Sequence, residues 1–254
     1  MSICGQAVHA GDSLRAMRLR HVTRADFASL ESTARRSIRY LASWPLRFIF
    51  FRGRIVADRG SQVSVGTWRR VRRTGLVEVG ENSVVHYSAL TSIEGHLSVG
   101  PGSKLCRGEK LRLGPRASMR TGSRCVIEPG ARIEVLGELV IGDDVYVGRD
   151  AVIVARSNVS IGSGTLIGER VSIHDANHGP ADARQAFRTA PVTIGSRAWI
   201  AAGVVVTAGA SVGDCTTVGA NAVVVGEIPA SVIAAGVPAK VVRTLPTCNS
   251  APAT

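Results

Sequence analysis

Aromatic residues are scarce in this chain of 254 residues, at only 4% of the sequence. Because aromatic side chains normally supply the largest areas of a globular core, their scarcity indicates a core of thin, repeated layers made from smaller aliphatic side chains. Hydrophobic residues still make up 45% of the chain, and glycine is abundant at 28 residues. This composition excludes a disordered protein, and the length allows one or two domains.

Cysteine is also sparse, and its positions are far apart. No CxxC pair occurs, and the count of five is odd: Cys4, Cys106, Cys125, Cys215 and Cys248. Such a pattern argues against a disulfide framework and favours a reducing compartment.

Long hydrophobic runs are missing as well. The first twenty residues contain no apolar stretch typical of a secretory signal. The most apolar segment, residues 41–51, is interrupted by Pro45 and Arg47, and it is shorter than the roughly 20 residues that a membrane-spanning helix needs. We therefore expect a cytoplasmic protein.

Acidic residues are rare in the first 75 positions, which hold fifteen arginines and only four acids, a charge of +11. Residues 76–254 carry +1, from sixteen basic and fifteen acidic groups. Within the basic region, residues 24–44 place apolar side chains at helical spacing, which predicts an amphipathic helix. The region is predicted to bind an anionic membrane surface, at the inner face of the cytoplasmic membrane, or to cap the following domain or contact a partner. Nucleic acid is the least favoured partner, since no nucleic-acid-binding module is recognisable.

After residue 76 the sequence repeats, and apolar residues fall six apart. The cleanest run is Ile194, Ile200, Val206, Val212, Val218 and Val224. A period of six fits neither a helix nor an alternating strand but suits a parallel β-solenoid, in which the apolar residue and the residue four positions later point inward. We expect the glycines that follow the apolar residue (Gly195, Gly213, Gly219) to permit a positive φ at the turn. A β-sandwich with regular strands is the alternative fold.

The six-residue register breaks between Ile173 and Ile194. The intervening segment is polar and contains the closest pair of histidines in the chain, His174 and His178. We expect it to form a loop that leaves the solenoid and carries function, as loops on rigid scaffolds commonly do.

Three phrases carry a family resemblance: NHGPADAR from Asn177, PVTIGSRAWIAAG from Pro191, and VGANAVVVGEIPASVIAAGVPAKVVR from Val218. At these residues the chain resembles the hexapeptide-repeat acyltransferases, and most closely their maltose, galactoside and polysaccharide O-acetyltransferases. The resemblance is specific over residues 139–245, and from residue 76 to 138 only the repeat matches. It implies that the all-β solenoid expected over residues 76–245 is a left-handed parallel β-helix. A basic, partly helical N-terminal region (1–75) would precede it, and a flexible tail (246–254) would follow. It also implies a homotrimer, with each active site between two subunits.

The resemblance further implies roles for individual residues. His178, in the phrase Asn-His-Gly, matches the catalytic base, a role that suits the pKa of imidazole. Acyl-coenzyme A binding would fall on Trp199, Ala202, Ala220, Lys240 and Arg243. Acceptor binding would fall on His174, Asp175, Asn177 and Asp150, although Asp175 and Asn177 are equally suited to forming turns. Gly148 departs from the pattern, because sugar acetyltransferases tend to have asparagine there.

These features together predict a coenzyme-A-dependent O-acyltransferase, using acetyl-CoA or another acyl-CoA, that acts on a hydroxyl of a saccharide or glycolipid. An antibiotic or nucleotide-sugar acceptor and a non-catalytic binding scaffold are the alternatives. We expect no metal, because the remaining histidines (His9, His21, His86, His96) are far from the loop in the sequence.

Overall fold

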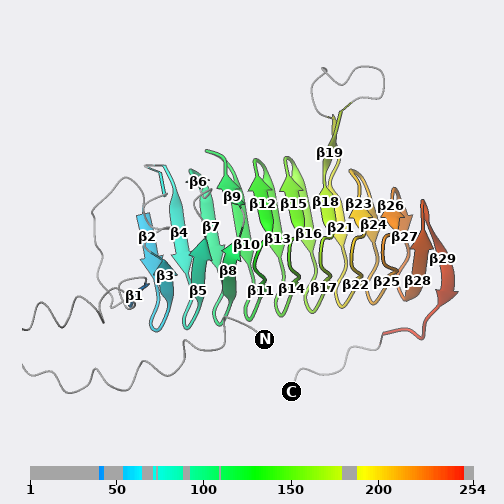
Figure 1. Cartoon of the computed structure of the whole chain (residues 1–254), viewed down its shortest axis with the longest axis horizontal. Helices are drawn as coiled ribbons and strands as arrows, with labels where there is room; N and C mark the ends of the chain where they lie inside the picture. Colours follow the sequence, from blue (N-terminus) through cyan, green and yellow to red (C-terminus); the bar gives the residue numbers. More distant parts are fainter. Residues whose placement is uncertain are drawn as a thin grey trace, which may run out of the picture.

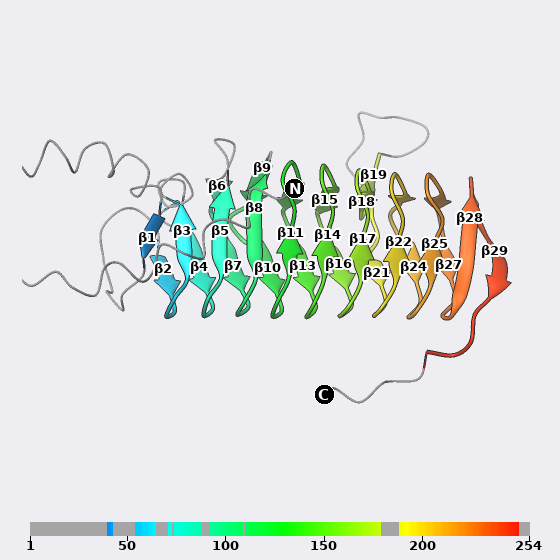
Figure 2. The same cartoon turned by 60° about the horizontal axis from the view of Figure 1, so that its bottom comes forward.

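The protein folds as a parallel β-solenoid whose coils stack along one long axis (Figure 1). The computed structural model describes residues 40–42, 54–64, 71–72, 74–87, 92–108, 110–178 and 188–248. Each complete coil, from the one that begins with β4 (Leu76–Val79) to the one that ends with β26 (Val223–Val224), contributes one short strand to each of three sheets, which Figure 2 shows from a second side. We name these sheets A, B and C, with eleven, nine and seven strands respectively.

The strands of sheet A are β1 (Tyr40–Ala42), β3 (Gln62–Ser64), β5 (Val84–Tyr87), β8 (Lys104–Gly108), β11 (Val126–Ile127), β14 (Tyr146–Val147), β17 (Leu166–Ile167), β22 (Trp199–Ile200), β25 (Thr217–Val218), β28 (Val232–Gly236) and β29 (Ala239–Thr244). Those of sheet B are β2 (Arg54–Ala57), β4 (Leu76–Val79), β7 (His96–Val99), β10 (Ser118–Thr121), β13 (Glu138–Ile141), β16 (Asn158–Ile161), β21 (Val192–Ile194), β24 (Ser211–Val212) and β27 (Glu227–Ile228). Those of sheet C are β6 (Ser92–Ile93), β9 (Lys110–Leu113), β12 (Arg132–Val135), β15 (Val152–Ala155), β18 (Ser172–His174), β23 (Val205–Val206) and β26 (Val223–Val224). The chain visits the sheets in the order B, A, C, so each coil has three corners, A/C, C/B and B/A, named for the sheets that they join.

The predicted six-residue pattern is confirmed by the burial of its residues. Every apolar residue of the run from Ile194 to Val224 is at most 2% exposed. The residues four positions later also point into the core, and all are at most 6% exposed: Ala198, Val204, Ala210, Thr216, Ala222 and Ile228. The interior is therefore a set of vertical columns of aliphatic side chains, which explains why so few aromatic residues are needed.

The glycines after the apolar positions do not serve the purpose that we expected. Gly195, Gly213 and Gly219 have no positive φ; the residue two positions after each of them, Arg197, Cys215 or Asn221, has the left-handed φ instead. At Gly195 and Gly213, glycine is required because the backbone of the next coil passes very close. A Cβ atom on Gly195 would lie 2.6 Å from the backbone nitrogen of Asp214, and one on Gly213 would collide with the backbone of Ala230.

The solenoid begins earlier than residue 76. Strand β2 pairs in parallel with β4, and β3 pairs in parallel with β5, so residues 54–64 already belong to the sheets. Within the predicted helix of residues 24–44, the described residues Tyr40–Ala42 form strand β1, which pairs antiparallel with β3 at the edge of sheet A. The helix prediction is wrong for these three residues, and the rest of that helix lies outside the described residues. Among those that are described, no helix has the length and hydrophobicity that crossing a bilayer requires.

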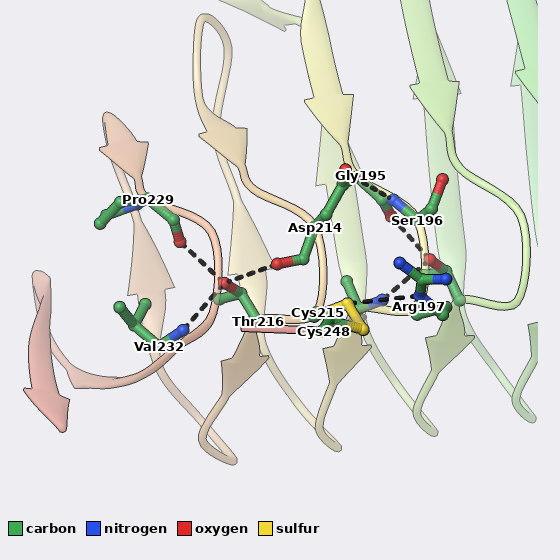
Figure 3. The surroundings of a disulfide bond; sticks show 11 residues. Gly195, Ser196, Arg197, Asp214, Cys215, Thr216, Pro229, Val232 and Cys248 are labelled. Carbon is green, nitrogen blue, oxygen red and sulfur yellow. Dashed lines mark hydrogen bonds between the residues drawn. A yellow bond between two sulfur atoms is a disulfide. The ribbon is translucent and has the colours of Figure 1, made fainter. Parts of the chain in front are cut away.

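A disulfide joins Cys215 to Cys248, which the cysteine spacing did not lead us to expect (Figure 3). Cys215 occupies a B/A corner, where Arg197 Nε lies 3.3 Å from its sulfur. The chain returns along β29 after β28, and the backbone N–H of Leu245 donates to Ser231. Part of the predicted flexible tail is therefore fastened to the last coils, while Cys106 and Cys125 are buried and take no part in this disulfide.

We expect Gly195→Ala to lower the free energy of unfolding by about 1–3 kcal/mol, because the methyl group would push on the backbone of the next coil. Gly226→Ala is the matched control, since a Cβ there meets nothing within 4 Å. This control should be neutral or stabilising by less than about 1 kcal/mol. Chemical denaturation measures both variants, and equal stability of the two would contradict the close-packing explanation.

Reduction of the disulfide should also destabilise the protein. The bond closes a sequence separation of 33 residues, for which loop-entropy arguments give about 4 kcal/mol. Denaturation curves with and without reductant measure this difference. A Cys248→Ser variant should show the reduced stability under both conditions, and a reductant effect that persists in this variant would show that another bond is responsible.

Candidate functional site

The expected excursion from the solenoid follows β18. Paired residues of successive coils in sheet B are 20 residues apart from Leu139 to Val159, but 33 residues apart from Val159 to Val192. The extra residues leave at the C/B corner as an antiparallel ribbon of β19 (Ala176–Asn177) and β20 (Arg188–Thr189). In Figure 1 this ribbon projects away from the stacked coils. The sequence therefore located the excursion correctly.

Asp175 anchors the ribbon to the preceding coil of the chain. Its carboxylate is fully buried and accepts hydrogen bonds from the backbone N–H groups of Arg156, at 2.7 Å, and Ser157, at 2.6 Å. Its own carbonyl accepts from the N–H of Ala190 on the returning strand. These partners match the turn-forming role that the sequence left open for Asp175, and they determine where the excursion leaves the solenoid.

His174 and Ser172 form a hydrogen-bonded pair on the outer face of β18. The Ser172 Oγ lies 2.7 Å from His174 Nε2, and both side chains are half-buried. Burial lowers the pKa of His174, and the positive charge of Arg132 lowers it further, against the opposing effect of Asp175. The imidazole is therefore neutral at pH 7 and available as a hydrogen-bond partner.

The two other predicted residues of this group stand on the ribbon. Asn177 is the last residue of β19 and pairs with Arg188, and His178 follows it. Both side chains are exposed, so solvent and a ligand can reach the imidazole of His178. The segment that connects His178 to β20, residues 179–187, lies outside the described residues.

A second group of predicted residues lies on sheet A and at the A/C corner. Trp199 is 53% exposed, pairs with Leu166 below and Thr217 above, and lies in the same coil as Ala202. Ala202 and Ala220 occupy neighbouring levels of the A/C corner, where the N–H of Asn221 donates to the carbonyl of Ala202.

Lys240 and Arg243 continue this group toward the C-terminal end of the solenoid. Both lie exposed on β29, which pairs with β28 as the last strand of sheet A. Arg243 pairs with Ile233, which pairs with Thr217, so Arg243 stands three strands from Trp199 in one register column. At a strand spacing of about 4.8 Å, this column is about 14 Å long.

Asp150 lies with this second group and away from the histidines. It occupies the A/C corner with a left-handed φ of 56°. A Cβ atom on Gly130 would collide with its Oδ1, so its carboxylate packs against the coil below. The structure thus separates Asp150 from His174 and His178, which belong to the C/B corner.

One chain therefore does not bring all the predicted site residues together. His174, Asp175, Asn177 and His178 gather at the C/B corner, whereas Trp199, Ala202, Ala220, Lys240, Arg243 and Asp150 gather along sheet A and the A/C corner. Sheet C separates the two groups within each coil.

Sequence reasoning missed several residues beside these groups. Ser172 was not singled out, although its spacing of two from His174 places both on one face of a strand. Tyr146 and Leu166 were also missed; they are 38% and 48% exposed and stand below Trp199 in the same column of sheet A. Within the described part of the chain, no three His, Cys, Asp or Glu side chains gather as a metal site.

Relatives of this chain include proteins that are named as acetyltransferases. No family model matches the sequence. The chain is 32% identical over 124 residues to WcaF of Escherichia coli K12, a protein named as a colanic acid biosynthesis acetyltransferase, covering 49% of this chain and 68% of the relative. It is 36% identical over 141 residues to WbbJ of the same organism, named as a lipopolysaccharide biosynthesis O-acetyl transferase, covering 50% of this chain and 71% of the relative.

Solved structures of similar proteins include a hexapeptide-repeat acetyltransferase of Vibrio cholerae in complex with acetyl-coenzyme A. That structure matches 57% of this chain and 72% of its own, with 24% identity and a TM-score of 0.44. A galactoside acetyltransferase in complex with coenzyme A matches 47% of this chain and 61% of its own, with 30% identity and a TM-score of 0.39.

Proposed function

Because this chain belongs to the hexapeptide-repeat acyltransferases, we propose that it transfers an acetyl group from acetyl-CoA to a hydroxyl of a saccharide or glycolipid. The family membership agrees with the predicted left-handed parallel β-helix. The two E. coli relatives are named for acetyl transfer in the synthesis of colanic acid and lipopolysaccharide, which supports a glycan acceptor.

The observation that carries the proposal is the exposed His178 at the end of a strand that Asp175 fixes to the solenoid. In the proposed reaction, His178 takes the proton of the acceptor hydroxyl as its oxygen attacks the thioester carbonyl. The C–S bond then breaks, and the coenzyme A thiolate leaves and takes up a proton. A backbone N–H at Ala202 stabilises the negative oxygen of the tetrahedral intermediate.

The second group of residues is suited to the long coenzyme A molecule. Small residues line the A/C corner beside Trp199, including Gly168, where a Cβ would lie 2.7 Å from the backbone nitrogen of Ala202. We propose that the pantetheine arm follows this corner and that Lys240 and Arg243, at its end, bind phosphate groups.

The separation of the two groups supports a site shared between subunits. Within one chain, His178 and Trp199 belong to different faces of the solenoid. The row of Tyr146, Leu166 and Trp199 exposes apolar area on sheet A that a neighbouring subunit would cover. We therefore propose a homotrimer in which His178 of one subunit faces the coenzyme-binding corner of the next.

Residues 1–75 remain a candidate for peripheral contact with an anionic membrane, because of their charge of +11. The pairing of β1 with the edge of sheet A favours a capping role for at least part of this region. The two roles are compatible, since a cap needs only one face of the region.

We expect His178→Ala to lower the rate of acetyl transfer by about 10²–10⁴-fold, the usual contribution of a general base. Coenzyme A affinity should stay unchanged. The control is His96→Ala, a histidine that pairs with Glu78 on sheet B at 2.8 Å, away from both groups. Thiol release from acetyl-CoA with a panel of oligosaccharide acceptors measures turnover, and near-normal turnover of the His178 variant would refute its role as the base.

The shared site makes a separate prediction. His178→Ala and Trp199→Ala, each inactive or severely impaired alone, should regain activity when they are co-expressed and assemble together, because some sites then combine an intact His178 with an intact Trp199. Separate expression of each variant provides the baseline. A fully active monomer, shown by light scattering at assay concentration, would contradict this arrangement.

A further inference from the structure

The outer face of sheet C carries an ordered set of side chains below the excursion. Two register columns run up this face through β9, β12, β15 and β18. The first column holds Lys110, Arg132, Val152 and Ser172, and the second holds Arg112, Glu134, Val154 and His174.

The charges that these columns carry on β9 and β12 do not cancel, because three cations stand with one carboxylate. Glu134 Oε2 lies 2.7 Å from Lys110 Nζ, and its Oε1 lies 2.9 Å from Arg112 Nη1. Burial would raise the pKa of Glu134, but its hydrogen bonds and ion pairs with Lys110 and then Arg112 outweigh this and lower it. The only carboxylate of the two columns is thus ionised and engaged by two cations.

Arg132 remains as an exposed positive charge. Its side chain forms no ion pair with any carboxylate of the described residues, although it stands beside Glu134 on the same face of β12. A guanidinium in this state binds a carboxylate or phosphate readily, because its planar N–H groups match two anionic oxygens.

Val152 and Val154 separate Arg132 from the Ser172–His174 pair. Both valines point outward from β15 and are half-buried, so the strand offers an apolar floor one strand wide. Two strand spacings, about 10 Å, lie between the level of Arg132 and that of Ser172. Binding sites for small molecules commonly combine such an apolar floor with a few polar groups at its edges.

The upper edge of this floor leads directly to the proposed base. Ser172 and His174 offer hydrogen-bonding groups there, and the next residue, Asp175, anchors the ribbon that presents His178. A sugar lying on Val152 and Val154 would therefore have one end near Arg132 and the other toward the excursion.

We propose that this face binds an acceptor saccharide that carries an anionic group, a carboxylate or a phosphate, which pairs with Arg132 while the sugar packs on Val152 and Val154. This inference rests on the proposed function, and it adds the chemical class of the acceptor. Arg132 is then a residue that determines specificity, with no part in the chemical step.

Direct binding to the full-length protein without acetyl-CoA tests the proposal. The probes are a hyaluronan tetrasaccharide (carboxylate), glucose 1-phosphate (phosphate) and cellotetraose (neutral), titrated by calorimetry or NMR. At least one anionic probe should bind more tightly than cellotetraose and weaken as salt is raised. The probe that binds identifies which anionic group the site accepts.

Arg132→Gln should weaken binding of that probe by about tenfold or more, as expected for loss of a charge-assisted pair. It should leave the affinity for cellotetraose unchanged. Arg116→Gln is the matched control, an exposed arginine in the turn before β10 with no ion pair among the described residues. This control should bind all probes as the unmodified protein does.

The outcomes for the two proposals are distinguishable. Equal affinity for anionic and neutral probes, no binding of any probe, or an Arg132→Gln variant that retains full affinity would each overturn the inference. Selective binding of an anionic probe without thiol release from acetyl-CoA would overturn the proposed function and leave this anionic site standing. Thiol release with neutral acceptors that is unchanged in Arg132→Gln would support the proposed function and overturn the anionic site.

Discussion

The parallel hydrogen bonds between successive coils are the interaction on which the rest of this structure depends. They hold each coil in register with the next, so that Leu97, Met119, Leu139, Val159 and Val192 form one continuous buried column. Because the register is shared by all three sheets, the place of a residue within its hexapeptide determines whether it faces the core, the outside or a corner. Insertions are tolerated only where they leave this register and rejoin it, as the excursion between β18 and β21 does.

The same register explains why the proposed active site is divided. A residue that follows a strand of sheet A stays at the A/C corner in every coil, and one that follows sheet C stays at the C/B corner. No substitution moves Trp199 and Ala202 toward His178 within one chain, because the hydrogen bonds of sheet C maintain the distance. The ribbon of the excursion places His178 outside its own coil, where in the proposed trimer it faces a neighbouring subunit.

Close packing between coils accounts for features that local propensity does not predict. The residues with left-handed φ at the B/A corners include Arg124, Asp144, Arg197 and Cys215, while neighbouring glycines have ordinary φ values. The glycines are placed where the backbone of the next coil leaves no room for a Cβ. Buried hydroxyls serve the same stacking: Thr216 Oγ1 donates to the carbonyl of Pro229 and accepts from the N–H of Val232 (Figure 3).

The sequence by itself determined the solenoid, its inward positions and the place of the excursion, because a period of six and its single large interruption depend only on residue order. Family resemblance located His178 and Trp199 as candidates. Only the tertiary structure decided that the Asp175 carboxylate accepts hydrogen bonds from the backbone of Arg156 and Ser157. These residues are 19 and 18 positions away in the sequence, so the contact depends on how the coils stack. The tertiary structure likewise decided the Cys215–Cys248 bond, the pairing of β1 with β3, and the isolation of Arg132 beside an engaged Glu134, since each depends on which segments the stacking brings side by side.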